Sequence, residues 1–500
     1  MGKVYLVGAG PGDPELLTLK GKRALERAGC VLYDNLANHS LLDLAPQAAE
    51  RIYVGKKKAE HAVSQDEICA MIIARARRGL DVVRLKGGDP FIFGRGGEEA
   101  EALHQAGVAF EVIPGITTPL GIAAYAGIPL THREHTSVVT FVTGHDPEAI
   151  DWSKTGSETL VIYMGLSTFA RVAEKLIANG RSAETPAAAV RWATRPDQEV
   201  VVGTLASLAG LIHDRGLRPP ATIIVGEVVR LRDRLSWFEQ LPLFGQRIVV
   251  TRPAGQSTGI AASLRDLGAD VIELPAIEIV APEDTQPIER AIRELSDYAW
   301  LVFTSANGVE GFCNALDNSS WDWRDVRARI AVIGPATRAA VEALHLKVDV
   351  MAGEYVAESL ADVLSESDVA GKRILLPRAA VARDTLPEDL RRKGASVDVV
   401  EAYRSVAPEN LASRAAEALT AGRRPDWITF TSSSTVSNLV RVAPPGSLEG
   451  IKVATIGPVT SATARKLGLA VTVEASAYTA DGLVAAILNA ALIHGRTPPG

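Results

Sequence analysis

The second half of the chain contains an internal repeat, which limits its fold more than any other feature of the sequence. The segment IVVTRP returns as ILLPRA, with Arg252 and Arg378 126 residues apart, and Phe303 returns as Phe430 after 127 residues. Two further blocks return after 123 residues. An offset this constant over four blocks indicates that residues 246–500 are two copies of one architecture.

Each copy alternates short β-branched runs with helical patterns, which predicts βαβ units and parallel sheets. We expect each copy to supply its own sheet, and the two sheets to form a two-lobed body with crossings near Ile277–Ala281 and Tyr403–Pro408. Small polar turns such as Thr304-Ser305 follow the strands and can cap the next helix. Ligands of such sheets bind at the carboxyl ends of the strands, where these turns lie.

The first half has the same α/β pattern but no copy of that repeat. A boundary is predicted near Ser236–Gln246, where Pro242 and Gly245 precede a new β-branched run. Helices are predicted over Asp66–Arg78 and Gly97–Ala106. Strands are predicted over Val4–Val7, Val31–Tyr33, Val82–Leu85, Val138–Thr143, Leu160–Tyr163 and Ala221–Val225.

Composition narrows the class of protein. The chain has 500 residues, too many for one core, and its 47% of hydrophobic residues indicate a globular protein. The net charge is −6, whereas nucleic-acid-binding proteins typically carry an excess of basic residues. Three widely spaced cysteines favour a reducing compartment over a disulfide framework or a zinc site, and no apolar run reaches about 18 residues. We therefore expect a soluble, cytoplasmic protein without a metal that binds neither nucleic acid nor membrane.

A glycine-rich turn follows the first predicted strand, with the sequence GAGPGD from Gly8 to Asp13. Such glycines let a backbone approach a ligand closely, although a simple tight turn explains them equally well. The turn is not the dinucleotide fingerprint, because Asp13 stands where that motif needs glycine and Pro11 lacks an amide for a pyrophosphate. A nucleoside without a phosphate fits better.

Two more loops of this kind follow later strands. Val82–Leu85 leads into KGGDPFIFG, in which the Asp89 carboxylate suits a ribose hydroxyl or an ammonium, and Val112-Ile113 leads into PGITT. Each loop alone is weak evidence, but three loops in this order indicate one ligand site.

Residues 1–243 closely resemble uroporphyrinogen-III C-methyltransferases, which are tetrapyrrole methylases. The resemblance lies in VGAGPGDPELLTLKG, LYDNL, VGK, RLKGGDPFIFGRGGEE, PGITT, GIPLTHR and VIYMG. Residues 246–500 are similar to uroporphyrinogen-III synthases, a divergent family of bilobed α/β proteins, through VVTRP, FTSANGV, IGPAT, FTSSSTV, IGPVT and YTADGLV. The resemblance implies a two-lobed methylase domain followed by a bilobed, internally duplicated parallel-sheet synthase domain.

The resemblance also implies the chemistry. The synthase half would close hydroxymethylbilane to uroporphyrinogen III with inversion of the last ring. The methylase half would then transfer two methyl groups from S-adenosylmethionine, giving precorrin-2 for siroheme or cobalamin. Asp34 would accept a proton and Lys56 donate one, although a turn cap and an exposed lysine explain these two residues as well. The residues implied to line the cofactor site are Pro11, Gly87, Gly88, Asp89, Ile92, Thr117, Thr118, Met164 and Ala193. Thr118 departs from the alanine of many relatives.

An acidic protein must meet the carboxylates of these substrates with local positive charge. Arginine suits this task because its planar fork binds carboxylates in pairs of hydrogen bonds. The candidates are Arg95, His132 and Arg133 in the first half and Arg252, Arg378 and Arg404 in the second.

The synthase half offers no pair of a histidine and a carboxylate for acid–base catalysis and no metal-ligand spacing. Tyr403 is the best candidate to assist departure of the substrate hydroxyl, with Ser305, Ser432 and Thr460 as further contacts at strand ends. Two alternatives stay open: a methylase of a later corrin intermediate, and a bilobed half that senses tetrapyrroles without catalysis. The family resemblance further implies a homodimer through the methylase half.

Overall fold

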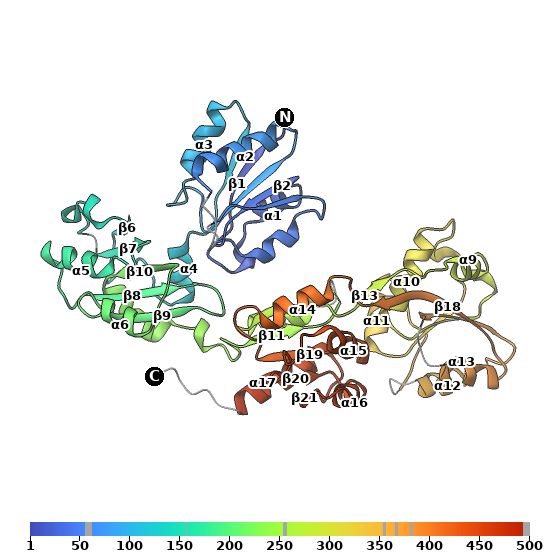
Figure 1. Cartoon of the computed structure of the whole chain (residues 1–500). Coiled ribbons are helices and arrows are strands. Elements are labelled where there is room, and N and C mark those ends of the chain that lie inside the picture. Colours follow the sequence, from blue (N-terminus) through green and yellow to red (C-terminus); the bar gives the residue numbers. More distant parts are fainter. Residues whose placement is uncertain are drawn as a thin grey trace. The chain divides into compact units, whose positions relative to one another are not determined.

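The computed structural model describes residues 1–55, 63–156, 158–253, 258–353, 357–365, 369–380 and 384–493. Contacts between Cα atoms divide the chain into two compact units, drawn in Figure 1. The first consists chiefly of residues 1–246, and the second of residues 247–263 and 271–490. The predicted proton donor Lys56 lies outside the described residues. No helix within the described ranges is long and apolar enough to cross a membrane.

The first unit begins with a parallel five-stranded sheet in the order β3-β2-β4-β1-β5. Alternate residues of its strands face opposite sides, so Val4 and Leu6 pack against one pair of helices and Val7 against another helix. The strands are β1 (Val4–Gly8), β2 (Cys30–Tyr33), β3 (Glu50–Tyr53), β4 (Val82–Lys86) and β5 (Phe110–Ile113). The covering helices are α2 (Gln65–Arg77) and α3 (Gly96–Gln105) on the Val4 side and α1 (Leu19–Leu25) on the other.

A second five-stranded sheet completes the first unit, in the order β6-β7-β10-β8-β9. Only β6 and β7 run parallel; the other neighbours are antiparallel. Its strands are β6 (Val139–Thr143), β7 (Thr159–Tyr163), β8 (Pro186–Arg191), β9 (Glu199–Thr204) and β10 (Ala221–Val225). Its helices are α4 (Thr118–Tyr125) on one face, α5 (Phe169–Ala178) and α6 (Leu208–Asp214) on the other, and α7 (Arg232–Leu235) near the end of the unit.

The six predicted strands and both predicted helices of the first half are confirmed, with bounds that differ by one residue at most. The strands β3, β8 and β9 were not predicted. Gly8 and Lys86, which the prediction placed in loops, are the last residues of β1 and β4.

The second unit contains two further sheets. One has the order β12-β11-β19-β20-β21, and the other has β13-β18-β17-β14-β15-β16. The first comprises β11 (Arg247–Val250), β12 (Asp270–Glu273), β19 (Trp427–Phe430), β20 (Lys452–Thr455) and β21 (Val471–Glu474). The second comprises β13 (Glu278–Val280), β14 (Trp300–Phe303), β15 (Arg329–Val332), β16 (Val350–Met351), β17 (Arg373–Ala379) and β18 (Ser396–Val406).

Helices connect these strands along both copies of the repeat. The first copy contains α8 (Thr258–Asp266), α9 (Gln286–Arg293), α10 (Ala306–Asp317), α11 (Pro335–Glu342) and α12 (Ala357–Ser365). The second contains α13 (Thr385–Arg392), α14 (Leu411–Thr420), α15 (Ser433–Val442), α16 (Pro458–Lys466) and α17 (Ala480–Ile493).

The expectation that each copy forms its own sheet is wrong, because both sheets combine strands of the two copies. β11 and β12 of the first copy join β19, β20 and β21 of the second, and β17 and β18 join β14, β15 and β16. Equivalent residue pairs make the two junctions: Ile248 lies opposite Trp427, and Ile374 lies opposite Trp300. The two predicted crossings lie side by side, since β13 pairs antiparallel with the end of β18. Each copy therefore depends on the other for its sheets.

Candidate functional site

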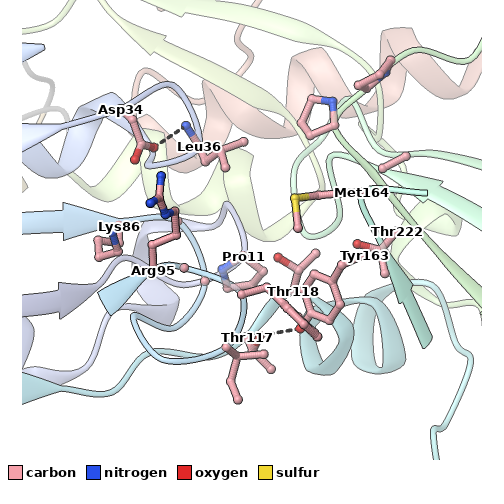
Figure 2. Close-up of a pocket in the computed structure, with 18 of the residues that line it drawn as sticks. Pro11, Asp34, Leu36, Lys86, Arg95, Thr117, Thr118, Tyr163, Met164 and Thr222 are labelled. Carbon is pink, nitrogen blue, oxygen red and sulfur yellow. Dashed lines mark hydrogen bonds between the residues drawn. The ribbon is translucent and has the colours of Figure 1, made fainter. Parts of the chain in front are cut away.

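A cavity of about 610 Å³ in the first unit is lined by segments of both of its sheets. Figure 2 shows Asp34, Lys86 and Arg95 on one side and Met164, Tyr163 and Thr222 on the opposite side. The volume lies within the range of small-molecule and cofactor sites. The wall mixes apolar side chains with glycine-rich backbone and a few polar groups, which is typical of such sites.

Most of the predicted site residues of the methylase half meet in this cavity. Those that line it are Pro11, Asp34, Gly87, Gly88, Ile92, Arg95, Thr117, Thr118, Met164 and Ala193. Asp89, His132 and Arg133 are not among the lining residues. His132 instead lies in a turn with His135, and the two imidazole rings stack with their centroids 4.8 Å apart.

The glycines of the three predicted loops lie against one another. A Cβ added to Gly115 would lie 2.3 Å from the carbonyl oxygen of Gly88, and one added to Gly8 would lie 2.5 Å from the Cα of Gly115. Gly88 and Gly10 also exchange backbone hydrogen bonds of 2.7 and 3.2 Å. The sequence predicted that such glycines admit a ligand. In the structure, Gly8 and Gly115 serve first to pack the three loops together.

Asp89 connects two of these loops. Its Oδ1 accepts from the Phe91 amide at 2.8 Å, and its Oδ2 accepts from the Gly115 amide at 3.0 Å. Both carboxylate oxygens therefore have backbone partners, so the side chain holds the loop after β4 against the loop after β5. A direct contact to the ribose remains a prediction.

Asp34 sits at the edge of the cavity in a network that sequence reasoning missed. Its Oδ1 accepts from the Leu36 amide at 3.0 Å, which is the turn cap considered above, and its Oδ2 accepts from Arg84 Nη2 at 3.0 Å. Arg84 Nε in turn donates to the buried Glu99 at 3.2 Å, and Lys86 Nζ donates to the same oxygen at 2.9 Å. Arg84 and Lys86 both line the cavity.

The alternation of residues along β4 could have pointed to Arg84 and Lys86. Val82 packs toward α2 and α3, and every second residue of a strand shares a face, so Arg84 and Lys86 lie on that side as well. A charged residue in a buried strand needs a partner there. Glu99 supplies one, since it lies on the buried face of α3 with Leu103.

Strained backbone gathers around the cavity. Six non-glycine residues in the described part of the chain have left-handed φ values, and four of them line this cavity: Phe93, Arg95, Met164 and Trp192. Such strain is common at binding sites, where the surrounding structure holds it in place. The Tyr163 hydroxyl bonds to Thr117 Oγ1 at 2.7 Å, and burial raises the pKa of Tyr163 to about 12.

The synthase candidates divide between the two sheets of the second unit. Ser305 and Ser432 occupy equivalent positions, where each hydroxyl caps the next helix, as predicted for these turns. The Tyr403 hydroxyl lies 3.1 Å from Ser305 Oγ. Tyr403 also lines a second cavity of about 440 Å³ between β13, α9, α10 and β18. Thr460 is buried at the start of α16.

The predicted arginines of this unit differ in their partners. Arg378 pairs with Asp384, and Arg404 pairs with Glu283. Arg252 has no hydrogen bond or ion pair to any residue that the structure describes, and burial lowers the pKa of its guanidinium.

Comparison with known proteins divides the chain in the same way. Residues 3–209 match the model of tetrapyrrole (corrin/porphyrin) methylases, and residues 259–485 match that of uroporphyrinogen-III synthase HemD. A porphyrin biosynthesis protein HemD from Ruminiclostridium josui is 34% identical over 499 residues, which are 98% of this chain and 98% of that protein. The chain belongs to this family of fused methylases and synthases.

Two further matches are named as C-methyltransferases. A uroporphyrinogen-III C-methyltransferase from Bacillus subtilis is 39% identical over 349 residues, which are 68% of this chain and 71% of that protein. A crystal structure of uroporphyrin-III C-methyl transferase from Thermus thermophilus, complexed with S-adenyl homocysteine, is 43% identical and matches 46% of this chain and 100% of its own, with a TM-score of 0.40. The family is enzymatic: an S-adenosylmethionine-dependent uroporphyrinogen-III C-methyltransferase precedes a uroporphyrinogen-III synthase in tetrapyrrole biosynthesis.

The cavity suits S-adenosylmethionine. Its wall includes the backbone of Gly10, Gly87 and Gly88, whose peptide groups can form hydrogen bonds with the hydroxyl and amino groups of such a ligand. Ile92 and Ala193 add apolar side chains to this wall. Thr118 adds a hydroxyl to the wall. S-adenosylmethionine has no phosphate group, so the site needs no cluster of backbone amides to bind one.

Proposed function

We propose that this chain converts hydroxymethylbilane to uroporphyrinogen III in its second half and methylates that product twice in its first half, giving precorrin-2. The observation that carries the proposal is the presence of both families in one chain, combined with a cavity that gathers nine of the residues implied by the resemblance together with Arg95. Precorrin-2 would serve the siroheme or cobalamin branch. Consecutive reactions explain why the two enzymes are joined.

In the methylase half, the bound cofactor would supply the methyl group that the electron-rich pyrrole carbon attacks. The protein must hold that carbon in line with the methyl group and remove a proton from the methylated ring. Asp34 is the proposed acceptor, since its carboxylate faces the cavity and is held in position by Leu36 and Arg84. Lys56 is the proposed donor, on the family resemblance alone.

Substrate carboxylates would bind arginines at both sites. Arg95 is the proposed partner in the methylase cavity; its guanidinium shares an exposed ion pair with Glu98 at 2.9 Å, which a substrate can replace at little cost. His132 and Arg133 are proposed to contact the parts of the macrocycle that extend beyond the cavity. In the synthase half, Arg252, Ser432 and Thr460 would contact the substrate from one sheet, and Ser305, Arg378 and Tyr403 from the other.

A matched pair of variants tests the acceptor. Asp34→Asn should slow methyl transfer by roughly 10²–10⁴, the usual contribution of a general base, and leave synthase activity unchanged. Asp43→Asn changes an exposed aspartate of the same segment and should leave both activities unchanged. A folded Asp34→Asn protein with full methylation would remove Asp34 from the mechanism.

We also propose a division at residues 243/246 and a homodimer through the methylase half. The homodimer rests on the family resemblance. Light scattering of the full chain and of residues 1–243 should give twice the monomer mass for both. A monomeric full chain would contradict the dimer.

A further inference from the structure

A fully buried carboxylate lies beneath the methylase cavity. Glu99 is 0% exposed, and its Oε1 accepts from Lys86 Nζ at 2.9 Å, Gln65 Nε2 at 3.1 Å and Arg84 Nε at 3.2 Å. Its Oε2 has no hydrogen-bond partner in the described structure. Burying a charged group in this way is costly, so its partners indicate what it does.

Of the two cations that Glu99 holds, Lys86 has more capacity left for a ligand. The Arg84 guanidinium already contacts Glu99, the Leu85 carbonyl and Asp34. Among the residues that the structure describes, Lys86 has one hydrogen-bond partner, Glu99, whereas an ammonium has three N–H donors. Its side chain is 5% exposed and lines the cavity, so a ligand in the cavity can reach the remaining donors.

We propose that Lys86 binds one carboxylate of the tetrapyrrole substrate, and that Glu99 is the positioning residue that holds the Lys86 ammonium in place and charged. The inference rests on the proposed function, because it assigns one contact of that substrate. The carboxylate would accept from the N–H donors of Lys86 that Glu99 leaves unused, and would give the ammonium a second anionic partner.

The charges around Lys86 predict how this contact depends on pH. Burial, followed by the neighbouring Arg84, holds the pKa of the Lys86 ammonium below its usual value, and Glu99 opposes this effect. The titratable groups that act on Lys86 or respond to it are Arg84 on the same strand, Asp34 after β2, Cys69 on α2, and Glu98 and Glu99 on α3. Substrate affinity should therefore fall as pH rises through the lowered pKa of Lys86.

The first variant removes the anchor and retains its length. Lys86→Met in the full-length protein should raise KM for uroporphyrinogen III about ten- to a hundredfold, or about 1.4–2.8 kcal/mol. The affinity for S-adenosylhomocysteine, measured by calorimetry, should stay within about twofold of the parent. Glu101→Gln, an exposed change on the same helix, is the matched control and should alter neither quantity. An unchanged KM in Lys86→Met overturns the proposal.

The second variant separates positioning from a merely structural effect. In Glu99→Gln the amide oxygen can take the place of Oε1, and no donor contacts the Oε2 position that the NH₂ would occupy. Loss of the negative charge lowers the pKa of Lys86 further, so KM should begin to rise at a lower pH than in the parent. A KM–pH profile that matches the parent contradicts the role of Glu99.

A double variant keeps the test decisive if either single variant fails to fold. Lys86→Met with Glu99→Gln removes both charges together, which avoids leaving one of them buried and unpaired. The double variant should show the raised KM of Lys86→Met, and its KM should not rise further at alkaline pH. A KM equal to that of the parent refutes the proposal.

If the parent protein does not methylate uroporphyrinogen III, the proposed function fails and this inference fails with it. If the parent protein methylates uroporphyrinogen III and the variants have the same kinetics as the parent, only this inference is refuted.

Discussion

Gly115→Ala should destabilise the first unit, because this glycine lies where three loops meet. The added Cβ would lie 2.3 Å from the Gly88 oxygen and 2.7 Å from the Gly8 Cα. These distances are about 1 Å shorter than the ~3.5 Å at which such atoms pack best, and backbone atoms cannot rotate away. Overpacking of this kind costs about 1–3 kcal/mol.

The assay is thermal unfolding of the full-length protein, together with calorimetry of S-adenosylhomocysteine binding. For a unit of this size, about 1–3 kcal/mol corresponds to a fall in Tm of roughly 2–4 °C per kcal/mol. Cofactor affinity should fall as well, since Gly88 and Thr117 line the cavity and adjoin the displaced loops. Synthase activity should persist, because its candidate residues lie in the other unit.

Gly210→Ala is the matched control. Gly210 lies inside α6, and nothing is within 4 Å of the position of its added Cβ. Alanine there should leave stability unchanged or raise it by about 0.5–1 kcal/mol, the ordinary helix preference. If Gly115→Ala retains the parental Tm and cofactor affinity, the close approach of the three loops is wrong.

Three further predictions concern the remaining assignments. Asp89→Ala removes the acceptor of two loop amides and should weaken S-adenosylmethionine binding by about 1.5–3 kcal/mol, measured by calorimetry; unchanged affinity in a folded variant contradicts it. Residues 246–500 should fold alone, whereas 246–370 should not, because β14 would lack its partner β17 and β11 its partner β19; circular dichroism showing cooperative unfolding of the shorter fragment would refute the mixed sheets. Tyr403→Phe removes the hydroxyl beside Ser305 and should slow the synthase roughly ten- to a hundredfold, about 1.4–2.8 kcal/mol, while still giving the type III isomer; a folded variant that yields only type I would show that this hydroxyl directs the inversion.

Local patterns predicted most of the elements around the methylase cavity. The strand β1, its glycine-rich turn and the Asp89 loop follow from alternation and turn residues that act within a few positions of one another. The helix-capping function of Ser305 and Ser432 follows for the same reason. These features depend on neighbours in the sequence, so the sequence reveals them.

Pairing between distant segments escaped prediction. Two copies of one repeat offer equivalent strand edges, so the sequence does not reveal whether Ile248 pairs within its own copy or with Trp427 of the other. The antiparallel strands β8 and β9 lacked a short hairpin signal. The function of Glu99 was likewise hidden, because it depends on Arg84 and Lys86 approaching from another element.

The central claim is that one chain performs two consecutive reactions on a tetrapyrrole. Its most direct test is mass spectrometry of the products that the purified full-length protein forms from hydroxymethylbilane under anaerobic conditions, with and without S-adenosylmethionine. The account predicts uroporphyrinogen III without the cofactor, and a macrocycle carrying two added methyl groups with it. A type I macrocycle in the first reaction, or a product without added methyl groups in the second, would contradict it.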